Sequence, residues 1–129
     1  MATRYLVSGG TGDYNSTTNW AATSGGTSGA SFPVAADDII IDNNSLNATL
    51  NINVVSACKS FRASNYTGVV YMNSNLSVEG TAALGDITLS SGMTITGSGT
   101  FSKKGTSTTG RITSNGVIFD CNFSFTNTV

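Results

Sequence analysis

Histidine is absent from the chain, and charged side chains are scarce. Charged residues make up 10% of the 129-residue sequence, against about 25% in an ordinary soluble domain. Without histidine, a Ser-His-Asp or Cys-His site cannot form. The net charge is −1 and the few basic residues are scattered, so no basic face is expected to neutralise phosphate groups. These absences argue against nucleic acid as a partner.

Paired carboxylates are also missing from the strand-like part of the sequence. The chain has only seven Asp and Glu residues, and no two of them stand two apart within the later repeats, where they would share one strand face. We therefore predict that the chain is not an enzyme.

Long apolar runs are missing as well. No stretch approaches the roughly 20 apolar residues of a membrane-spanning helix, so we predict no membrane span. The start of the chain lacks the apolar segment of a signal peptide. We expect synthesis in the cytoplasm without a signal peptide.

Two cysteines and one acidic cluster are the candidate ligand groups. We predict that Cys58 and Cys121 are buried free thiols, with a disulfide between them as the alternative; two thiols without histidine do not make a zinc site. Asp37, Asp38 and Asp42 carry hard oxygen atoms close together in sequence, which is a weak candidate calcium site. Otherwise no cofactor is expected.

What the sequence does contain is short alternating runs of apolar and polar residues, which are typical of β-strands. They are separated by Gly, Asn, Ser and Thr, and they cover residues 50–54, 58–61, 69–72, 76–78, 87–89, 93–95, 117–119 and 121–125. Ile52, Val70 and Ile87 follow one another at separations of about 17 or 18 residues, and the match loosens over 103–110. We predict an all-β chain, a short-stranded parallel β-helix (β-solenoid) with a loop-rich cap. An antiparallel β-sandwich or jelly roll is the alternative.

The first 45 residues differ from the rest. We predict an N-terminal cap or attachment module over 1–45 and a repeat region over 46–129. Any helix is expected to be short and to lie within 14–24. The module includes a loop of about 16 residues over 21–36, and loops of that length are usually functional. The candidate residues for the core of this module, or for docking, are Tyr5, Trp20, Phe32 and Pro33. Trp20 is the only tryptophan and lies among Gly and Ser loops, so we expect it to pack in the core of the module.

The N-terminal stretch carries a family resemblance. Arg4-Tyr5-Leu6-Val7, the glycines that follow, Asn19-Trp20, Phe32-Pro33 and the stretch Asp37–Asp42 are similar to an N-terminal module of β-helical structural proteins from bacteriophages and from the surface of Bacteroidetes-type bacteria. About 40 residues are covered. Leu6 and Tyr14 stand where the family usually has Trp. The resemblance implies a structural or attachment role and assigns no catalytic residue.

The expected function is therefore a bacteriophage virion structural protein: a head or tail fibre, a spike or a capsid-decorating subunit. Such a protein would be found in the virion, most often as a homotrimer, with capsid or tail proteins as partners. The chain runs to its last residues in a strand pattern with no polar cap, so we expect either that another subunit covers this end or that the chain continues in the full-length product. The alternative is a secreted or cell-surface β-solenoid adhesin that binds a host glycan, for which Tyr66 and Tyr71 are the candidate sugar-stacking residues.

Overall fold

The computed structural model describes residues 1–7, 9, 11–80, 87–105 and 111–127. Within these ranges the regular structure consists of thirteen strands and two single-turn 3₁₀ helices. The prediction of an all-β chain is confirmed. One of the 3₁₀ helices, η1 (Thr17–Asn19), lies where a short helix was expected, and the other, η2 (Asn43–Ser45), was not expected.

The first sheet is built almost entirely from parallel neighbours that are far apart in sequence. Its order is β12-β10-β7-β4-β1-β3. The bounds are β1 (Thr3–Leu6), β3 (Trp20–Ala21), β4 (Asp38–Ile41), β7 (Ser60–Ala63), β10 (Ile87–Thr88) and β12 (Ile112–Thr113). Only the short β3 runs antiparallel to its neighbour, β1, at one edge of the sheet.

The second sheet is parallel in every pairing of its described strands. Its order is β2-β5-β8-β11-β9-β6, with β13 paired to β11. The bounds are β2 (Thr11–Asp13), β5 (Thr49–Asn51), β6 (Ser56–Cys58), β8 (Val69–Tyr71), β9 (Leu76–Val78), β11 (Thr94–Gly105) and β13 (Phe119–Asn127). The first part of β11 pairs with β8 and its second part with β9, so one long strand spans two earlier short ones. An antiparallel sandwich would require antiparallel neighbours throughout, which these pairings do not provide.

Successive passes of the chain stack in register, but with a different spacing from the one predicted. In the first sheet Ile39 lies beside Phe61, and Phe61 beside Ile87. Val70 lies beside Ile95 and not beside Ile87. The repeat of 17–18 residues is therefore wrong: the passes are longer and unequal, because the corners between strands differ in length. The irregular segment expected over 103–110 is a second prediction about spacing. It is wrong for residues 103–105, which continue β11, and residues 106–110 lie outside the described ranges.

The core lies between the two sheets and is filled by side chains in register. Ile39, Phe61 and Ile87 from the first sheet are completely buried, as are their counterparts Leu50, Val70 and Ile95 from the second. The rings of Phe61 and Phe101 meet edge to face across the core, with centroids 5.5 Å apart. Because each three- or four-residue strand buries at most three side chains, this core exists only when the passes stack.

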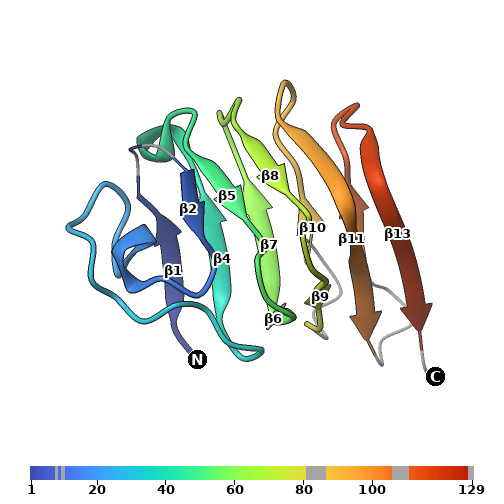
Figure 1. Cartoon of the computed structure of the whole chain (residues 1–129), viewed down its shortest axis with the longest axis horizontal. Coiled ribbons are helices and arrows are strands. Elements are labelled where there is room, and N and C mark those ends of the chain that lie inside the picture. Colours follow the sequence, from blue (N-terminus) through green and yellow to red (C-terminus); the bar gives the residue numbers. More distant parts are fainter. Residues whose placement is uncertain (8, 10, 81–86, 106–110, 128–129) are drawn as a thin grey trace.

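The predicted N-terminal module and the predicted repeat region share one sheet, because β4 pairs with both β1 and β7. The division at residue 45 stays a prediction, as does the N-terminal module itself. Figure 1 shows the N-terminal strands and the loops that follow them at one end of the stack, and β13 at the other. No helix among the described residues is long and apolar enough to cross a membrane.

Candidate interaction surfaces

The N-terminal end of the stack is closed by two aromatic side chains. Trp20 is completely buried and donates a hydrogen bond from Nε1 to the Tyr14 carbonyl oxygen, at 2.8 Å. The two rings meet edge to face, with centroids 5.6 Å apart. The Tyr14 hydroxyl donates to the carbonyl oxygen of Ala57 in β6, at 3.1 Å, and burial raises the Tyr14 pKa above its usual value. Both rings belong to the buried core.

The long loop after Trp20 is fastened across the same end. Arg4 of β1 donates from Nε to the Ser31 carbonyl oxygen at 2.8 Å and from Nη2 to the Ser31 hydroxyl at 2.6 Å. The backbone N–H of Ala30 donates to the Trp20 carbonyl oxygen at 3.0 Å. Arg4 is the register partner of the buried Ile39, so it lies at the end of a row of core residues. Its guanidinium group binds the polar loop at Ser31.

The four residues predicted for the cap core have different environments. Trp20 and Pro33 are buried, Tyr5 is half-buried, and Phe32 is 40% exposed. Trp20 therefore belongs to the core, whereas Phe32 is exposed at the surface. Val34, which the sequence reasoning did not single out, is 52% exposed beside it in sequence.

The three aspartates of the candidate calcium site are not brought together. Asp38 begins β4 and Asp42 follows its last residue, so the two are about 13 Å apart along the strand. Their oxygens have protein partners: Asp37 accepts from the Ala2 N–H at 2.6 Å, Asp38 from the Ser60 hydroxyl at 2.5 Å, and Asp42 from the Asn44 N–H at 2.9 Å. Among the described residues, no group of three or more His, Cys, Asp or Glu side chains is arranged to bind a metal. The carboxylates instead fasten turns and cap η2.

Both cysteines are free, but only one is buried. Cys58 is completely buried in the core, as predicted, whereas Cys121 is partly exposed on β13. Burial raises the pKa of each thiol above its usual value. Both thiols are therefore neutral and weakly nucleophilic at neutral pH, and neither environment suits a reactive cysteine.

The C-terminal end of the stack is open. Phe119 and Phe123 continue the aromatic core: the Phe123 ring lies 4.6 Å from that of Phe119 and 6.4 Å from that of Phe101, measured between centroids. Phe123 is nevertheless 40% exposed, and Phe125, its neighbour on the same strand face, is 53% exposed. Among the described strands, β13 pairs with β11 alone, so its other edge presents backbone N–H and C=O groups without a strand partner.

The outer face of the second sheet carries a shallow polar groove of about 240 Å³. Ser77, Ser102 and Ser124 line it from adjacent strands, together with Val55, Ser56, Asn75, Thr100 and Lys104.

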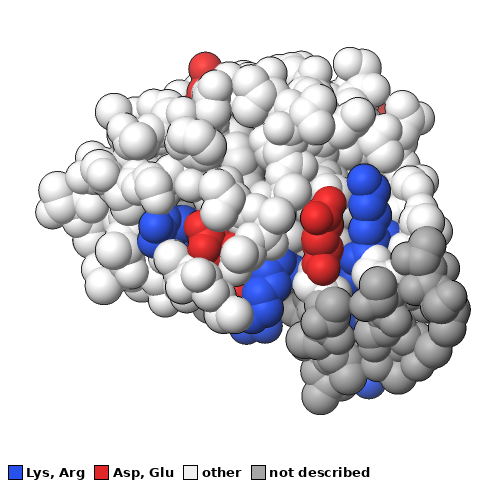
Figure 2. Space-filling view, turned by 90° about the horizontal axis from the view of Figure 1, so that it is seen from below, with Lys and Arg blue, Asp and Glu red and all other residues white. Residues whose placement is uncertain are grey.

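Figure 2 shows basic and acidic side chains alternating across one face of the molecule, so that neither sign accumulates. Lys59 forms an ion pair with Asp38, with Nζ 3.7 Å from Oδ2.

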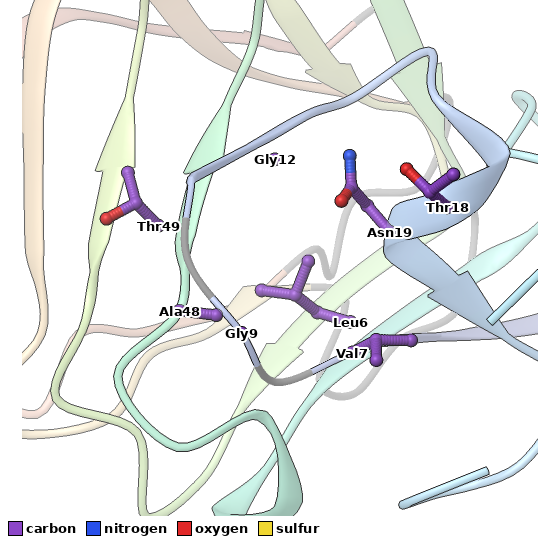
Figure 3. A pocket seen from close by; sticks show the side chains of 8 residues that line it. All are labelled: Leu6, Val7, Gly9, Gly12, Thr18, Asn19, Ala48 and Thr49. Carbon is purple, nitrogen blue, oxygen red and sulfur yellow. The ribbon is translucent and has the colours of Figure 1, made fainter. Parts of the chain in front are cut away.

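A smaller hollow near the first corner has room for little more than water. Its volume is about 40 Å³, far below the several hundred Å³ of a typical small-molecule site. Figure 3 shows the Asn19 side chain directed toward Gly12. A Cβ atom at residue 12 would overlap the Asn19 carboxamide, whose Nδ2 donates to the Asp13 carbonyl oxygen at 2.8 Å. The glycine thus permits a structural contact and does not form a binding site.

The proposed sugar-stacking pair of tyrosines is not formed. Tyr66 is completely buried, and its hydroxyl donates to the carbonyl oxygens of Ala48 and Val69. Tyr71 is 44% exposed on β8. A single exposed ring without its partner does not make an aromatic platform, so this interpretation is wrong.

Comparison with known proteins gives no relative from which a function could be carried over. No protein-family model, no curated protein sequence and no solved structure matches the chain.

Proposed function

We propose that the chain is a non-catalytic structural protein of a bacteriophage virion, a fibre, spike or capsid-decorating subunit that acts by self-assembly and docking. The observation that supports this most is the difference between the two ends of the stack. Tyr14 and Trp20 close one end, while Phe123 and Phe125 leave the other apolar and unpaired. A monomeric protein usually protects such a strand edge, and a subunit of an assembly uses it.

The architecture proposed with this function is a β-solenoid. Parallel stacking of successive passes in both sheets supports it, as does the core shared by neighbouring passes. The antiparallel β3 belongs to the closing segment at the edge and leaves the parallel stack intact.

The N-terminal segment is the proposed docking element for capsid or tail proteins. Its resemblance to an attachment module supports this assignment, and so does the exposure of Phe32 and Val34 on a loop that Arg4 holds in place. A loop fastened at its base keeps its shape on binding, which lowers the entropic cost of docking.

The proposed assembly is a homotrimer, with three chains side by side. Light scattering of the purified chain, before and after addition of SDS at room temperature, measures the solution mass. A mass of three chains that persists in SDS is the expected result. A single-chain mass at every concentration refutes the self-assembling form of the proposal.

The virion assignment has its own test. Particles purified from the phage or prophage that encodes the chain are examined by mass spectrometry and by labelling with an antibody. We expect the chain at a stoichiometric copy number in particles. Its recovery only from particle-free fractions refutes the virion role, whatever the solution mass.

The second candidate is a glycan-binding surface module, and the polar groove is the observation that favours it. Hydroxyl and amide groups line the groove with one lysine, which suits hydrogen bonding to neutral or weakly acidic sugars. A glycan array tests this second candidate. Binding to one defined class of glycan, lost in the Ser102→Leu variant, supports the glycan-binding module. Binding to no glycan on the array refutes it.

A further inference from the structure

The open edge of β13 is the least protected surface of the molecule. Between Cys121 and Asn127 the strand carries no charged residue and no proline, the two features by which natural sheets block their edges. Two of its aromatic side chains, Phe123 and Phe125, are already half-exposed at the end of the core. An added strand would bury both rings and satisfy the backbone groups of the edge.

We propose that this edge pairs with the same edge of a second copy, in an antiparallel arrangement about a two-fold axis at Ser124. This inference rests on the self-assembling part of the proposed function. It describes an end-to-end contact that is separate from the side-by-side contacts of a trimer, so two trimers joined in this way have the mass of six chains before SDS is added and of three chains afterwards.

The lengths of the edge strands explain why the partner is a second β13. Among the described strands, the other edges of the two sheets are β2, β3, β6 and β12, of two or three residues each, whereas β13 has nine. A head-to-tail contact would leave most of the β13 edge without a partner, so the β13 of another copy is the best-matched surface. Pairing of like with like closes after two copies and does not continue into a filament.

The register follows from the alternation of side chains. Residues that lie opposite each other must point to the same face, so the two-fold axis has to pass through a residue and not between two. Ser124 faces outward, because it lines the outer groove, and Phe123 faces the core. An axis at Ser124 places Phe123 opposite the partner's Phe125 and Phe125 opposite the partner's Phe123, so all four rings meet on the core face.

Charge and hydrogen bonding are compatible with this register. No like charges face each other, because the seven paired residues, 121–127, are uncharged. Seven residues on each strand form about seven backbone hydrogen bonds, close to the roughly ten of a typical protein interface.

A cysteine at the axis tests the register directly. Ser124→Cys in a Cys121→Ser background places the new thiol opposite itself, with Cα atoms about 4.5–5.5 Å apart, within disulfide range. Asn122→Cys in the same background is the matched control. It lies on the same outward face of the same strand, but about 13 Å along the strand from its counterpart in the partner.

Mild oxidation followed by non-reducing electrophoresis gives the readout. We expect at least tenfold more cross-linked dimer for Ser124→Cys than for Asn122→Cys. Equal cross-linking of the two variants indicates random collision and overturns the proposal, as does its absence from both.

A second variant tests the contact without cross-linking. Phe125→Glu puts a negative charge on an exposed edge position beside Lys103, its register partner in β11, so the fold should survive and the dissociation constant of the end-to-end pair should rise at least tenfold. Sedimentation velocity shows whether the variant stays compact, and sedimentation equilibrium measures the dissociation constant of the pair. An unchanged dissociation constant overturns the proposal. A trimer that forms without the Ser124 cross-link leaves the structural role standing and refutes only the end-to-end pairing.

Discussion

Leu46 is a residue whose replacement by glycine should stabilise the protein. It follows η2, with φ 49° and ψ −125°, a backbone conformation in which any side chain is strained, and 61% of its surface is exposed. The equivalent corner in other passes uses residues that tolerate positive φ, namely Asn65 at 52°, Gly92 at 89° and Asn115 at 49°. Leucine is the exception at a corner that the fold requires in every pass.

The magnitude follows from two opposing effects. Relief of the strained conformation contributes about 1–3 kcal/mol. Glycine makes the unfolded chain more flexible, which costs about 0.5–1 kcal/mol. Little burial is lost, because Leu46 is mostly exposed, and the N–H that bonds to the Asn43 carbonyl oxygen remains. We therefore expect Leu46→Gly to raise the free energy of unfolding by about 1 kcal/mol, or Tm by about 4 °C.

Urea unfolding followed by circular dichroism measures the change, and Leu46→Ala is the control. Alanine keeps the Cβ atom and hence the strain, so its free energy of unfolding should stay within about 0.5 kcal/mol of the parent. If the glycine variant is no more stable than the alanine variant, the backbone at residue 46 is not strained and the reasoning fails.

Three further predictions concern the core. Trp20→Ala should lower the free energy of unfolding by about 3–5 kcal/mol, while Phe32→Ala, at a 40% exposed site, should lower it by less than about 1 kcal/mol; urea unfolding of the two variants side by side tests the difference. Gly99→Ala should destabilise by more than about 2 kcal/mol, because the new Cβ would overlap the Ser74 carbonyl group; thermal unfolding no different from the parent would contradict this. Burial raises the pKa of Cys58 in the folded state, so the unfolded state releases the proton first and stability should fall as pH rises above about 8.5. Cys58→Ala should flatten that fall, and a thiol reagent at pH 8 should modify Cys121 but not Cys58 in the native protein.

Local features of the fold could be predicted from the sequence because they depend on local patterns. Alternation of apolar and polar residues gave the strands, and the absence of a 3.6-residue period excluded long helices. Trp20 was identified as a packing residue because a lone large ring among small residues has few other uses, and it is completely buried. Cys58 was expected to be buried because free cysteine behaves as a small apolar residue, and it is completely buried.

Features that depend on the corners could not be predicted. A three-residue strand carries too little information to specify which later strand lies beside it, so Val70 was matched to Ile87 although its partner is Ile95. The aspartates were grouped because they are close in sequence, but β4 separates Asp38 from Asp42 by its whole length. Tyr66 was proposed for sugar stacking, yet it is completely buried, and two carbonyl oxygens accept its hydroxyl proton.

The low charge of the chain has a structural reason in this architecture. Residues in register on neighbouring passes lie about 4.8 Å apart, so a repeated charge at one position would repel its neighbours along the whole stack. Amide groups avoid that cost and also bond to one another: Asn73 donates from Nδ2 to Asn51 Oδ1 at 2.6 Å, and Asn51 donates in turn to Asp13 Oδ1 at 2.7 Å.

The low charge of the chain also bears on its proposed assembly. A surface that can accept the next pass of its own chain without electrostatic cost can accept a strand from another copy equally well, because both pairings use the same backbone bonds. Among the described strands, β13 has the longest edge without a strand partner, nine residues against two or three at β2, β3, β6 and β12. The sparing use of charge that lets the passes stack therefore also leaves the last described strand open to pairing, which supports the proposed assembly contact at that end of the molecule.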